Sequence, residues 1–123
     1  MPDPGIGLDL VDIDRLERAL ARRPRLAARL FTAAELDFAA VRRRPASHLA
    51  VRFAAKEAAI KALGATVAPR QVEVWGGGRT PPRLVLHGRA AELASERGVE
   101  LQVALTHTDG TAAAVVLAVP HQD

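Results

Sequence analysis

The sequence predicts an α+β fold in which helices pack on a mostly antiparallel sheet. Three observations carry this prediction. An alanine-rich stretch, residues 52–64, contains no proline and ends in Gly64, as a helix with a glycine C-cap does. Segments near both ends of the chain alternate apolar and other residues with the period of a strand. Two of them, residues 101–106 and 111–119, are joined by Thr108-Asp109-Gly110, a sequence typical of a tight antiparallel turn.

The composition is that of one small domain with an aliphatic core. The chain has 123 residues and 49% of them are hydrophobic, but only three are Phe and one is Trp. We therefore expect a single domain, residues 1–123, built on Ala, Val, Leu and Ile. The lack of cysteine excludes disulfides, thiol nucleophiles and thiolate metal sites. No segment resembles a signal peptide or approaches the ~20 apolar residues that span a bilayer, which predicts a soluble cytoplasmic protein without a membrane partner.

The charge of the chain favours a polyanionic partner. The net charge is +3 and the pI is about 10.5, and the positive charge comes from fifteen arginines and only two lysines. Nucleic acid is the weaker choice of partner, because few aromatic side chains are available to stack on bases and no recognition-helix pattern is present.

Residues 6–13 are predicted to form the first strand, with Ile6, Leu8 and Leu10 on one face. Asp9 belongs to the other face, together with Gly7 and Val11. A carboxylate in an apolar strand is costly to bury unless it is paired or binds a metal. The alternative is an aspartate at the edge of the sheet that faces solvent.

Asp12 is the expected N-cap of a helix whose buried stripe contains Ile13, Leu16 and Leu20. Several arginines decorate the other faces of this helix and the turn after it. They include Arg15, Arg18, Arg22 and Arg25. This surface is either a solvated helix face or a binding site for an acidic partner.

The remaining elements complete the order β-α-α-α-β-β-α-β-β. Thr32 and Glu35 have the spacing of a capping box, which opens a short helix that ends near Val41. Ser47 is the expected N-cap of the central helix. Further along the chain we expect a strand at 71–75, a glycine-rich irregular turn at 76–82, a strand at 83–87 and a helix at 89–97. The three glycines of that turn could cradle a phosphate, but a plain hairpin connection fits the surrounding pattern better.

The central helix carries the most unusual charge pattern. Leu49, Phe53, Ile60 and Leu63 fall on one stripe, which we expect to face the core. Glu57 and Lys61 lie beside it, four residues apart, and could form an ordinary surface ion pair. Both lysines of this arginine-rich chain, Lys56 and Lys61, flank Glu57, so a compact ammonium is favoured there over a guanidinium. Lys56 falls within the apolar stripe, where a packed stem with its ammonium extended to solvent is the simplest interpretation.

Three polar groups in otherwise apolar elements predict chemistry on phosphates. They are Asp9, the set Lys56-Glu57-Lys61, and Thr106-His107-Thr108. Two carboxylates suit magnesium, which keeps several waters and takes other ligands from substrate phosphates. A nearby ammonium would neutralise diphosphate charge, and a histidine in a turn can donate to a second phosphate. Taken alone, a histidine such as His107 is more often a structural or surface residue.

The motifs resemble those of the holo-[acyl-carrier-protein] synthase family of 4′-phosphopantetheinyl transferases. The matching stretches are GIGLDLVDIDRL, FTAAELDFA, RFAAKEAAIKALG and LTHTDGTAAAVV, and they span residues 5–119. The resemblance implies the fold of these transferases and transfer of phosphopantetheine from coenzyme A to a serine of an acyl carrier protein, with release of adenosine 3′,5′-bisphosphate. It also implies magnesium and a homotrimer with active sites between subunits.

The same resemblance implies roles for individual residues. Asp9 and Glu57 match the magnesium ligands, and Lys61 matches the lysine that contacts the coenzyme A phosphates. Residues that match positions around the nucleotide and its 3′-phosphate are Arg52, His107 and Thr108. Arg15 matches the arginine that engages the acidic recognition helix of the carrier protein, so we assign the surface of Arg15, Arg18, Arg22 and Arg25 to that partner. Glu57, directly or through a magnesium-bound water, is the base expected for the serine.

The sequence departs from the family pattern after Gly64, where residues 65–70 are shorter than the usual glycine-containing segment. Because that segment helps to hold the nucleotide, the residues that bind coenzyme A are open to change. Ala104 and Thr111 also replace residues common in the family. We expect an active, divergent enzyme that serves a polyketide or type I fatty-acid carrier domain. The competing hypothesis is a catalytically impaired relative that only binds a carrier protein.

Overall fold

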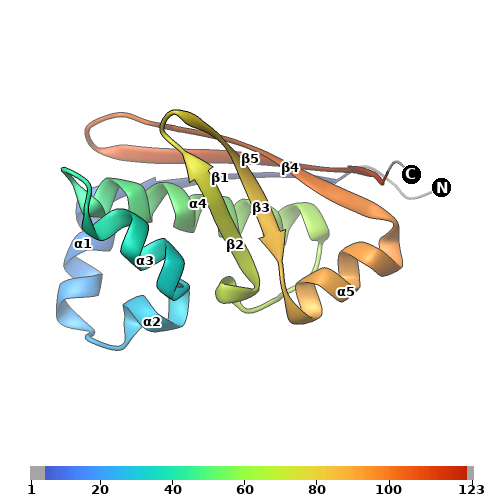
Figure 1. Cartoon of the computed structure of the whole chain (residues 1–123), viewed down its shortest axis with the longest axis horizontal. Helices are drawn as coiled ribbons and strands as arrows, with labels where there is room; N and C mark the ends of the chain where they lie inside the picture. Colours follow the sequence, from blue (N-terminus) through green and yellow to red (C-terminus); the bar gives the residue numbers. More distant parts are fainter. Residues whose placement is uncertain (1–4, 122–123) are drawn as a thin grey trace.

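Helix α4 (Pro45–Leu63) runs through the middle of the molecule, between a three-stranded and a two-stranded sheet (Figure 1). The computed structural model describes residues 5–121. The other elements are β1 (Gly5–Asp12), α1 (Ile13–Arg22), α2 (Leu26–Leu30), α3 (Ala33–Ala40), a 3₁₀ turn η1 (Pro69–Gln71), β2 (Val72–Gly77), β3 (Thr80–Leu86), α5 (Gly88–Arg97), β4 (Val99–His107) and β5 (Thr111–Pro120). Helices α1, α2 and α3 gather at one end of the molecule and α5 lies at the other (Figure 1).

The strands form two separate antiparallel sheets, with the orders β1-β5-β4 and β2-β3. The α+β class and the antiparallel pairing are confirmed. The hairpin β2-β3 crosses over α4 instead of extending the larger sheet (Figure 1). Alternation along a sequence shows which segments are strands, but packing around α4 decides which strands pair, so the division into two sheets lies beyond the sequence pattern.

Glycines in β1 and alanines in α4 let the first strand lie directly against the central helix. A Cβ on Gly7 would lie 2.7 Å from the carbonyl carbon of Ala58, and closer still to its oxygen. A Cβ on Gly5 would similarly approach the carbonyl group of Ala62. Neither contact is compatible with a side chain, so the glycines set the short separation of β1 and α4.

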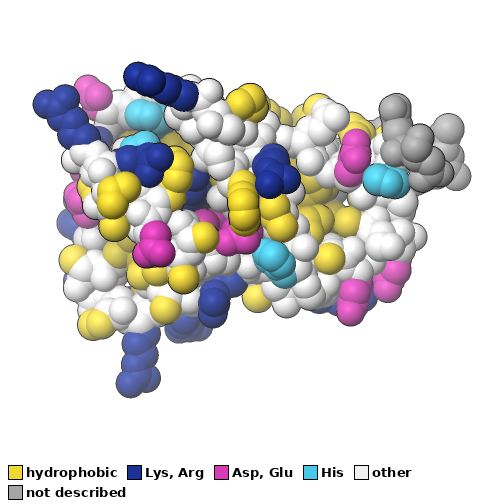
Figure 2. All heavy atoms as spheres, in the orientation of Figure 1, with side chains coloured by type: hydrophobic (Ala, Val, Ile, Leu, Met, Phe, Trp, Pro, Cys, Tyr) yellow, Lys and Arg dark blue, Asp and Glu magenta, His cyan; other side chains and the backbone are white. Residues whose placement is uncertain are grey.

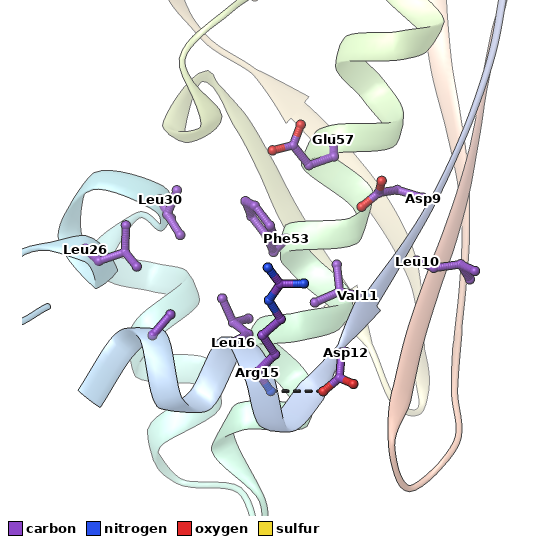
Figure 3. A pocket seen from close by; sticks show the side chains of 11 residues that line it. Asp9, Leu10, Val11, Asp12, Arg15, Leu16, Leu26, Leu30, Phe53 and Glu57 are labelled. Atoms are coloured by element: carbon purple, nitrogen blue, oxygen red, sulfur yellow. Dashed lines mark hydrogen bonds between the residues drawn. The ribbon is translucent and has the colours of Figure 1, made fainter. Parts of the chain in front are cut away.

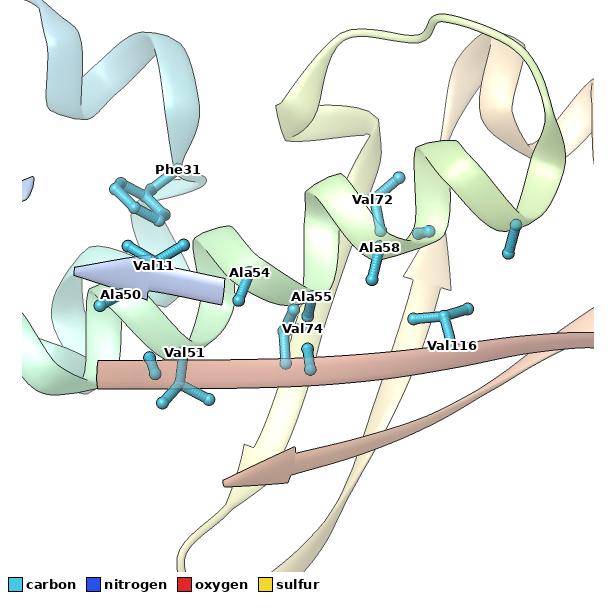
Figure 4. Close-up of a cluster of buried hydrophobic side chains, with 14 of the residues drawn as sticks. Val11, Phe31, Ala50, Val51, Ala54, Ala55, Ala58, Val72, Val74 and Val116 are labelled. Atoms are coloured by element: carbon cyan, nitrogen blue, oxygen red, sulfur yellow. The ribbon is translucent and has the colours of Figure 1, made fainter. Parts of the chain in front are cut away.

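The core surrounds α4 on almost every side. Leu49 and Leu63 are buried as the apolar stripe predicts, whereas Phe53 and Ile60 are only partly buried. The alanines between them are buried as well, because β1 and β5 cover one side of the helix and the hairpin β2-β3 covers another (Figure 4). A stripe drawn from large residues therefore underestimates how much of this helix is enclosed.

Most helix ends follow the predicted signals. Asp12 accepts a hydrogen bond from the Arg15 amide at 2.9 Å, and Thr32 and Glu35 form a complete capping box. Gly64 and Gly98 end their helices in the left-handed conformation, with φ of 68° and 65°. Helix α2 was not expected; it has five residues and no side-chain cap to mark its start.

Two local predictions are wrong. Ser47 is not the N-cap of α4, since the helix begins at Pro45 and the hydroxyl of Ser47 donates to the carbonyl of Arg44 within the first turn at 2.8 Å. Proline is favoured at that first position because its missing N–H would have no helical partner. The glycine-rich segment 76–82 is also more regular than predicted. Strand β2 continues to Gly77, which pairs with Thr80 at the start of β3, and the ladder is irregular between Trp75 and Gly77.

Candidate functional site

A pocket of about 640 Å³ brings together side chains from β1, α1, α2 and α4 (Figure 3). Its polar lining comes chiefly from Asp9, Glu57 and Arg15, and its apolar wall from residues such as Leu16, Leu30 and Phe53. Asp9 and Glu57 lie on the same side of α4, the side that faces α1 and α2, and the Arg15 side chain extends from α1 beside Phe53 (Figure 3). The pocket therefore combines both predicted metal ligands with the first arginine of the predicted partner surface.

The surroundings of Glu57 disfavour the ionised form of its carboxyl group. Burial raises the pKa of its carboxyl, and the charge of Asp9 raises this pKa further, while Lys61 opposes the effect. Two like charges that face one pocket destabilise each other unless a cation lies near both. The close approach of β1 and α4 is what brings the two carboxylates to the same pocket.

Lys61 pairs with Asp9 and with the first strand. Its Nζ donates to Asp9 Oδ1 at 3.1 Å and to the carbonyl of Leu8 at 2.9 Å. The cation thus lies between α4 and β1, and the alternative of an ordinary Glu57–Lys61 surface pair does not describe it. The side chain of Asp9 is 19% exposed, so the alternative of an aspartate free in solvent at a sheet edge is also wrong.

The donors at this pocket suit magnesium. Asp9 and Glu57 offer two carboxylates, and one of them has a raised pKa that a bound cation would relieve. In the described residues, 5–121, no group of three or more His, Cys, Asp or Glu could hold a metal ion. A pair of carboxylates without further protein ligands fits an ion that keeps its waters and binds substrate phosphates.

A second pocket, of about 520 Å³, is cationic and lies between α4, the turn of the hairpin β2-β3, and β4. Arg52 and His107, both predicted nucleotide-binding residues, line it together with His48 and Arg79. Arg52 is buried; its Nη2 donates to the carbonyl of Gly76 at 2.6 Å, and its guanidinium lies over the Phe38 ring at 3.9 Å. Backbone and aromatic contacts therefore fix this cation at the pocket wall.

The clustered cations of this pocket perturb one another. Burial, then Arg52, Arg42 and His107, lower the pKa of His48. Burial also lowers the pKa of Arg52, with Glu35 opposing and Arg42 adding to the effect. The neighbouring positive charges thus disfavour the protonated form of His48, and an anion bound among them would offset this repulsion. The pocket suits a phosphate or another compact anion.

The structure separates the predicted site residues into two groups. Asp9, Glu57 and Arg15 line the first pocket, and Arg52 and His107 line the second; among the described residues, the two pockets share none. Thr108 lines neither, because its hydroxyl accepts from the amides of Gly110 and Thr111 within its own turn. Reasoning from sequence missed His48, although its place four residues before Arg52 puts it on the same helix face.

The predicted arginine surface is fully accessible. Arg15, Arg18, Arg22 and Arg25 are all exposed on α1 and the turn that follows it. On the face shown in Figure 2, Lys and Arg side chains gather over the end of the molecule that contains α1, α2 and α3. In residues 5–121, no helix is long and apolar enough to span a membrane.

Comparisons with known proteins identify the family of the chain. The model of the 4′-phosphopantetheinyl transferase superfamily matches residues 5–116. The chain is 49% identical to the holo-[acyl-carrier-protein] synthase of Moorella thermoacetica over 117 residues, covering 90% of each, and 45% identical to that of Streptomyces griseus, covering 93% of this chain and 96% of the relative. It superimposes on the ACPS–CoA complex of Chronobacterium ammoniagenes with a TM-score of 0.84 at 30% identity, covering 98% and 99% of the two chains. The chain is therefore an enzyme of the holo-[acyl-carrier-protein] synthase family, within the 4′-phosphopantetheinyl transferase superfamily.

Proposed function

We propose that this enzyme transfers the 4′-phosphopantetheine group of coenzyme A to a serine of an apo acyl carrier protein, with magnesium, and releases adenosine 3′,5′-bisphosphate. The observation that carries the proposal is the pairing of a carboxylate pocket containing Asp9 and Glu57 with a cationic pocket containing Arg52 and His107. Coenzyme A needs both kinds of pocket, because its diphosphate binds through a metal and its 3′-phosphate through cations.

Asp9 and Glu57 would hold the magnesium ion. When bound, magnesium supplies positive charge to the diphosphate as the bond to the leaving group breaks. Lys61 lies beside Asp9, at 3.1 Å, and its exposed ammonium is placed to add charge on the same side. Such fixed charges favour the transition state because they need no rearrangement during the reaction.

The transfer is an in-line displacement at the β-phosphorus of coenzyme A. The serine oxygen forms a new bond to this phosphorus, the bond to the bridging oxygen of the diphosphate breaks, and adenosine 3′,5′-bisphosphate leaves with the electron pair. Glu57 accepts the serine proton, directly or through a water.

The apolar outer face of the larger sheet supports a homotrimer. Ile6, Leu8 and Leu10 are 67%, 60% and 68% exposed on β1, and Leu117, opposite Ile6 on β5, is exposed as well. A row of exposed aliphatic side chains of this kind is typical of a subunit interface. Because the two pockets of one chain have no described lining residue in common, we propose that the carboxylate pocket of one subunit and the cationic pocket of the next together form the site.

The acidic recognition helix of the carrier protein is the proposed partner of Arg15, Arg18, Arg22 and Arg25. Arg15 also lines the carboxylate pocket, so a carrier bound to these arginines would present its serine near Glu57. Complementary charge of this kind chiefly accelerates association and selects the partner, and its effect weakens as the salt concentration rises.

The deciding experiment is incubation with coenzyme A, magnesium and an apo carrier protein, followed by intact mass spectrometry. Transfer adds ~340 Da to the carrier through covalent modification of its serine. Glu57→Gln is expected to abolish transfer and keep carrier binding, while Glu92→Gln on the exposed face of α5 serves as a matched control with full activity.

Two results would overturn the proposal. If several carriers of fatty-acid and polyketide type show no mass increase with the wild-type protein, the catalytic assignment fails and the chain is a carrier-binding module. If Glu57→Gln transfers as fast as the wild type, the roles given to the carboxylates are wrong.

A further inference from the structure

Lys56 is buried in the middle of the molecule and is not exposed at any point. The predicted arrangement, with an ammonium extended to solvent, is wrong: both Lys56 and Glu35 have side chains that are 0% exposed, and Lys56 Nζ lies 2.8 Å from Glu35 Oε1. The ammonium also donates to the carbonyl of Val72 at 2.7 Å and to that of Pro69 at 3.0 Å. Each of its three hydrogens thus has an acceptor.

Glu35 is satisfied just as completely. Its Oε1 also accepts from the Thr32 amide at 2.9 Å, and its Oε2 accepts from the Val74 amide at 2.8 Å. The ion pair therefore joins α4 to the start of α3, to the 3₁₀ turn before β2, and to β2 at two alternate residues.

The need for a compact ammonium explains why an arginine-rich chain keeps a lysine here. The three acceptors belong to three segments and surround a single nitrogen atom. A guanidinium is planar and spreads its donors over a fork, so it cannot place three hydrogens on acceptors around one point. Lys61, the other lysine, instead contacts Asp9 and the carbonyl of Leu8 on strand β1.

The ion pair lies between the two halves of the candidate site. Arg52 is one helical turn before Lys56, and it too bonds the strand β2, through the carbonyl of Gly76. Glu57 is the next residue after Lys56 and lies about 100° further around the helix. Any rotation or sliding of α4 against the hairpin would therefore move Arg52 and Glu57 together.

We propose that Lys56 and Glu35 are positioning residues, which fix the rotation of α4 against β2 so that Arg52 and Glu57 are held in their separate pockets. The effect of the pair on transfer rests on the proposed function, whereas its effect on the position of the hairpin does not. A buried ion pair adds little stability, because the cost of desolvating two charges offsets their attraction. Here the pair bonds Pro69, Val72 and Val74, so α4 cannot shift against β2 without breaking these contacts.

The test uses the double variant Lys56→Met/Glu35→Gln, in which no buried charge is left unpaired and one side-chain oxygen remains for Val74. Lys56→Met and Lys56→Arg are measured beside it. Arg89→Met, which removes an exposed cation from α5, is the matched control. All are compared well below their unfolding temperatures, where every variant that folds is fully folded.

Two readouts separate positioning from stability. The first is kcat for transfer and KM for coenzyme A. The second is the quenching of Trp75 fluorescence by a soluble quencher, which can be measured without any ligand. Trp75 is the single tryptophan of the chain and lies on β2 between Val74 and Gly76. We expect the double variant to unfold within a few degrees of the wild type, to lose at least about tenfold in kcat/KM, since small misplacements are costly, and to change its Trp75 quenching. Lys56→Arg, which keeps the positive charge, should also fall below the wild type in kcat/KM.

Each outcome decides the question. If the double variant keeps either wild-type kcat/KM or wild-type Trp75 quenching, the pair does not position α4 against β2 and the inference is wrong, whatever the stability of the variant. Suppose that the wild-type protein shows no transfer, and that Trp75 quenching nevertheless changes in the double variant. The proposed function then fails, and the positioning of the hairpin by this pair stands. If Lys56→Met does not fold, the double variant and Lys56→Arg still give the answer.

Discussion

The distance between the carboxylates of Asp9 and Glu57 is predicted to depend on Gly7, a residue without a side chain. Gly7→Ala would place a Cβ 2.7 Å from the carbonyl carbon of Ala58 and 3.0 Å from the amide nitrogen of Ala62. Both atoms belong to the backbone of α4, so no side chain can rotate away. Strand β1 and helix α4 must then separate, and Asp9, two residues further along β1, moves away from Glu57.

The structure gives the size of the effect. Ordinary contact with a Cβ begins near 3.4 Å, and the carbonyl oxygen of Ala58 lies closer to the new Cβ than its carbon does. The strand must therefore retreat by roughly 1.5 Å. A displacement of that size at reacting groups costs about 100-fold in rate. Overpacking should also lower the free energy of unfolding by about 1–3 kcal/mol.

The assay is phosphopantetheine transfer followed by intact mass at several magnesium concentrations, with the unfolding temperature measured in parallel. Gly110→Ala is the control, because a Cβ there meets no atom within 4 Å, and it should behave as the wild type. Transfer by folded Gly7→Ala within about threefold of the wild type would refute the argument that this glycine sets the carboxylate separation.

Three further predictions follow from the described contacts. Magnesium at ten times its Kd should stabilise the wild type by about 1.4 kcal/mol and the variant Asp9→Asn much less. Thermal unfolding with and without the metal measures both effects, and an equal shift in the two proteins would show that Asp9 is not a magnesium ligand. Burial alone would raise the pKa of Glu73, but hydrogen bonds, among them those from Thr32 and His87, lower it to about 2. Its ionised form therefore stabilises the fold above the ordinary glutamate pKa, and this contribution is lost as the pH falls toward 2. Glu73→Gln should cost about 1.5–3 kcal/mol at pH 7 and progressively less below pH 4.5, in denaturant titrations; a pH-independent cost would contradict the assignment. Leu8→Lys should dissociate the proposed trimer in analytical ultracentrifugation, whereas an unchanged sedimentation coefficient would exclude the β1 face as the interface.

Sequence patterns were sufficient where the cause of a structure is local. The cap at Asp12, the capping box of Thr32 and Glu35, and the glycine ends of α4 and α5 each depend on residues within one turn. The short helix α2 lacks such a signal and was missed. At the candidate site, residue types suggested that Asp9 and Glu57 act together and the family motif supported this, but nothing local places a strand against a helix about fifty residues away.

Lys56 shows the limit most clearly. The sequence determined that a lysine falls on the apolar side of the central helix, and that the chain keeps lysine there despite its preference for arginine. Only the tertiary structure decided where the ammonium goes, because its partners Glu35, Pro69 and Val72 come from three segments on either side of α4 in the sequence. Burying a charge is costly unless acceptors surround it, and the acceptors of Lys56 come together only once those segments have packed.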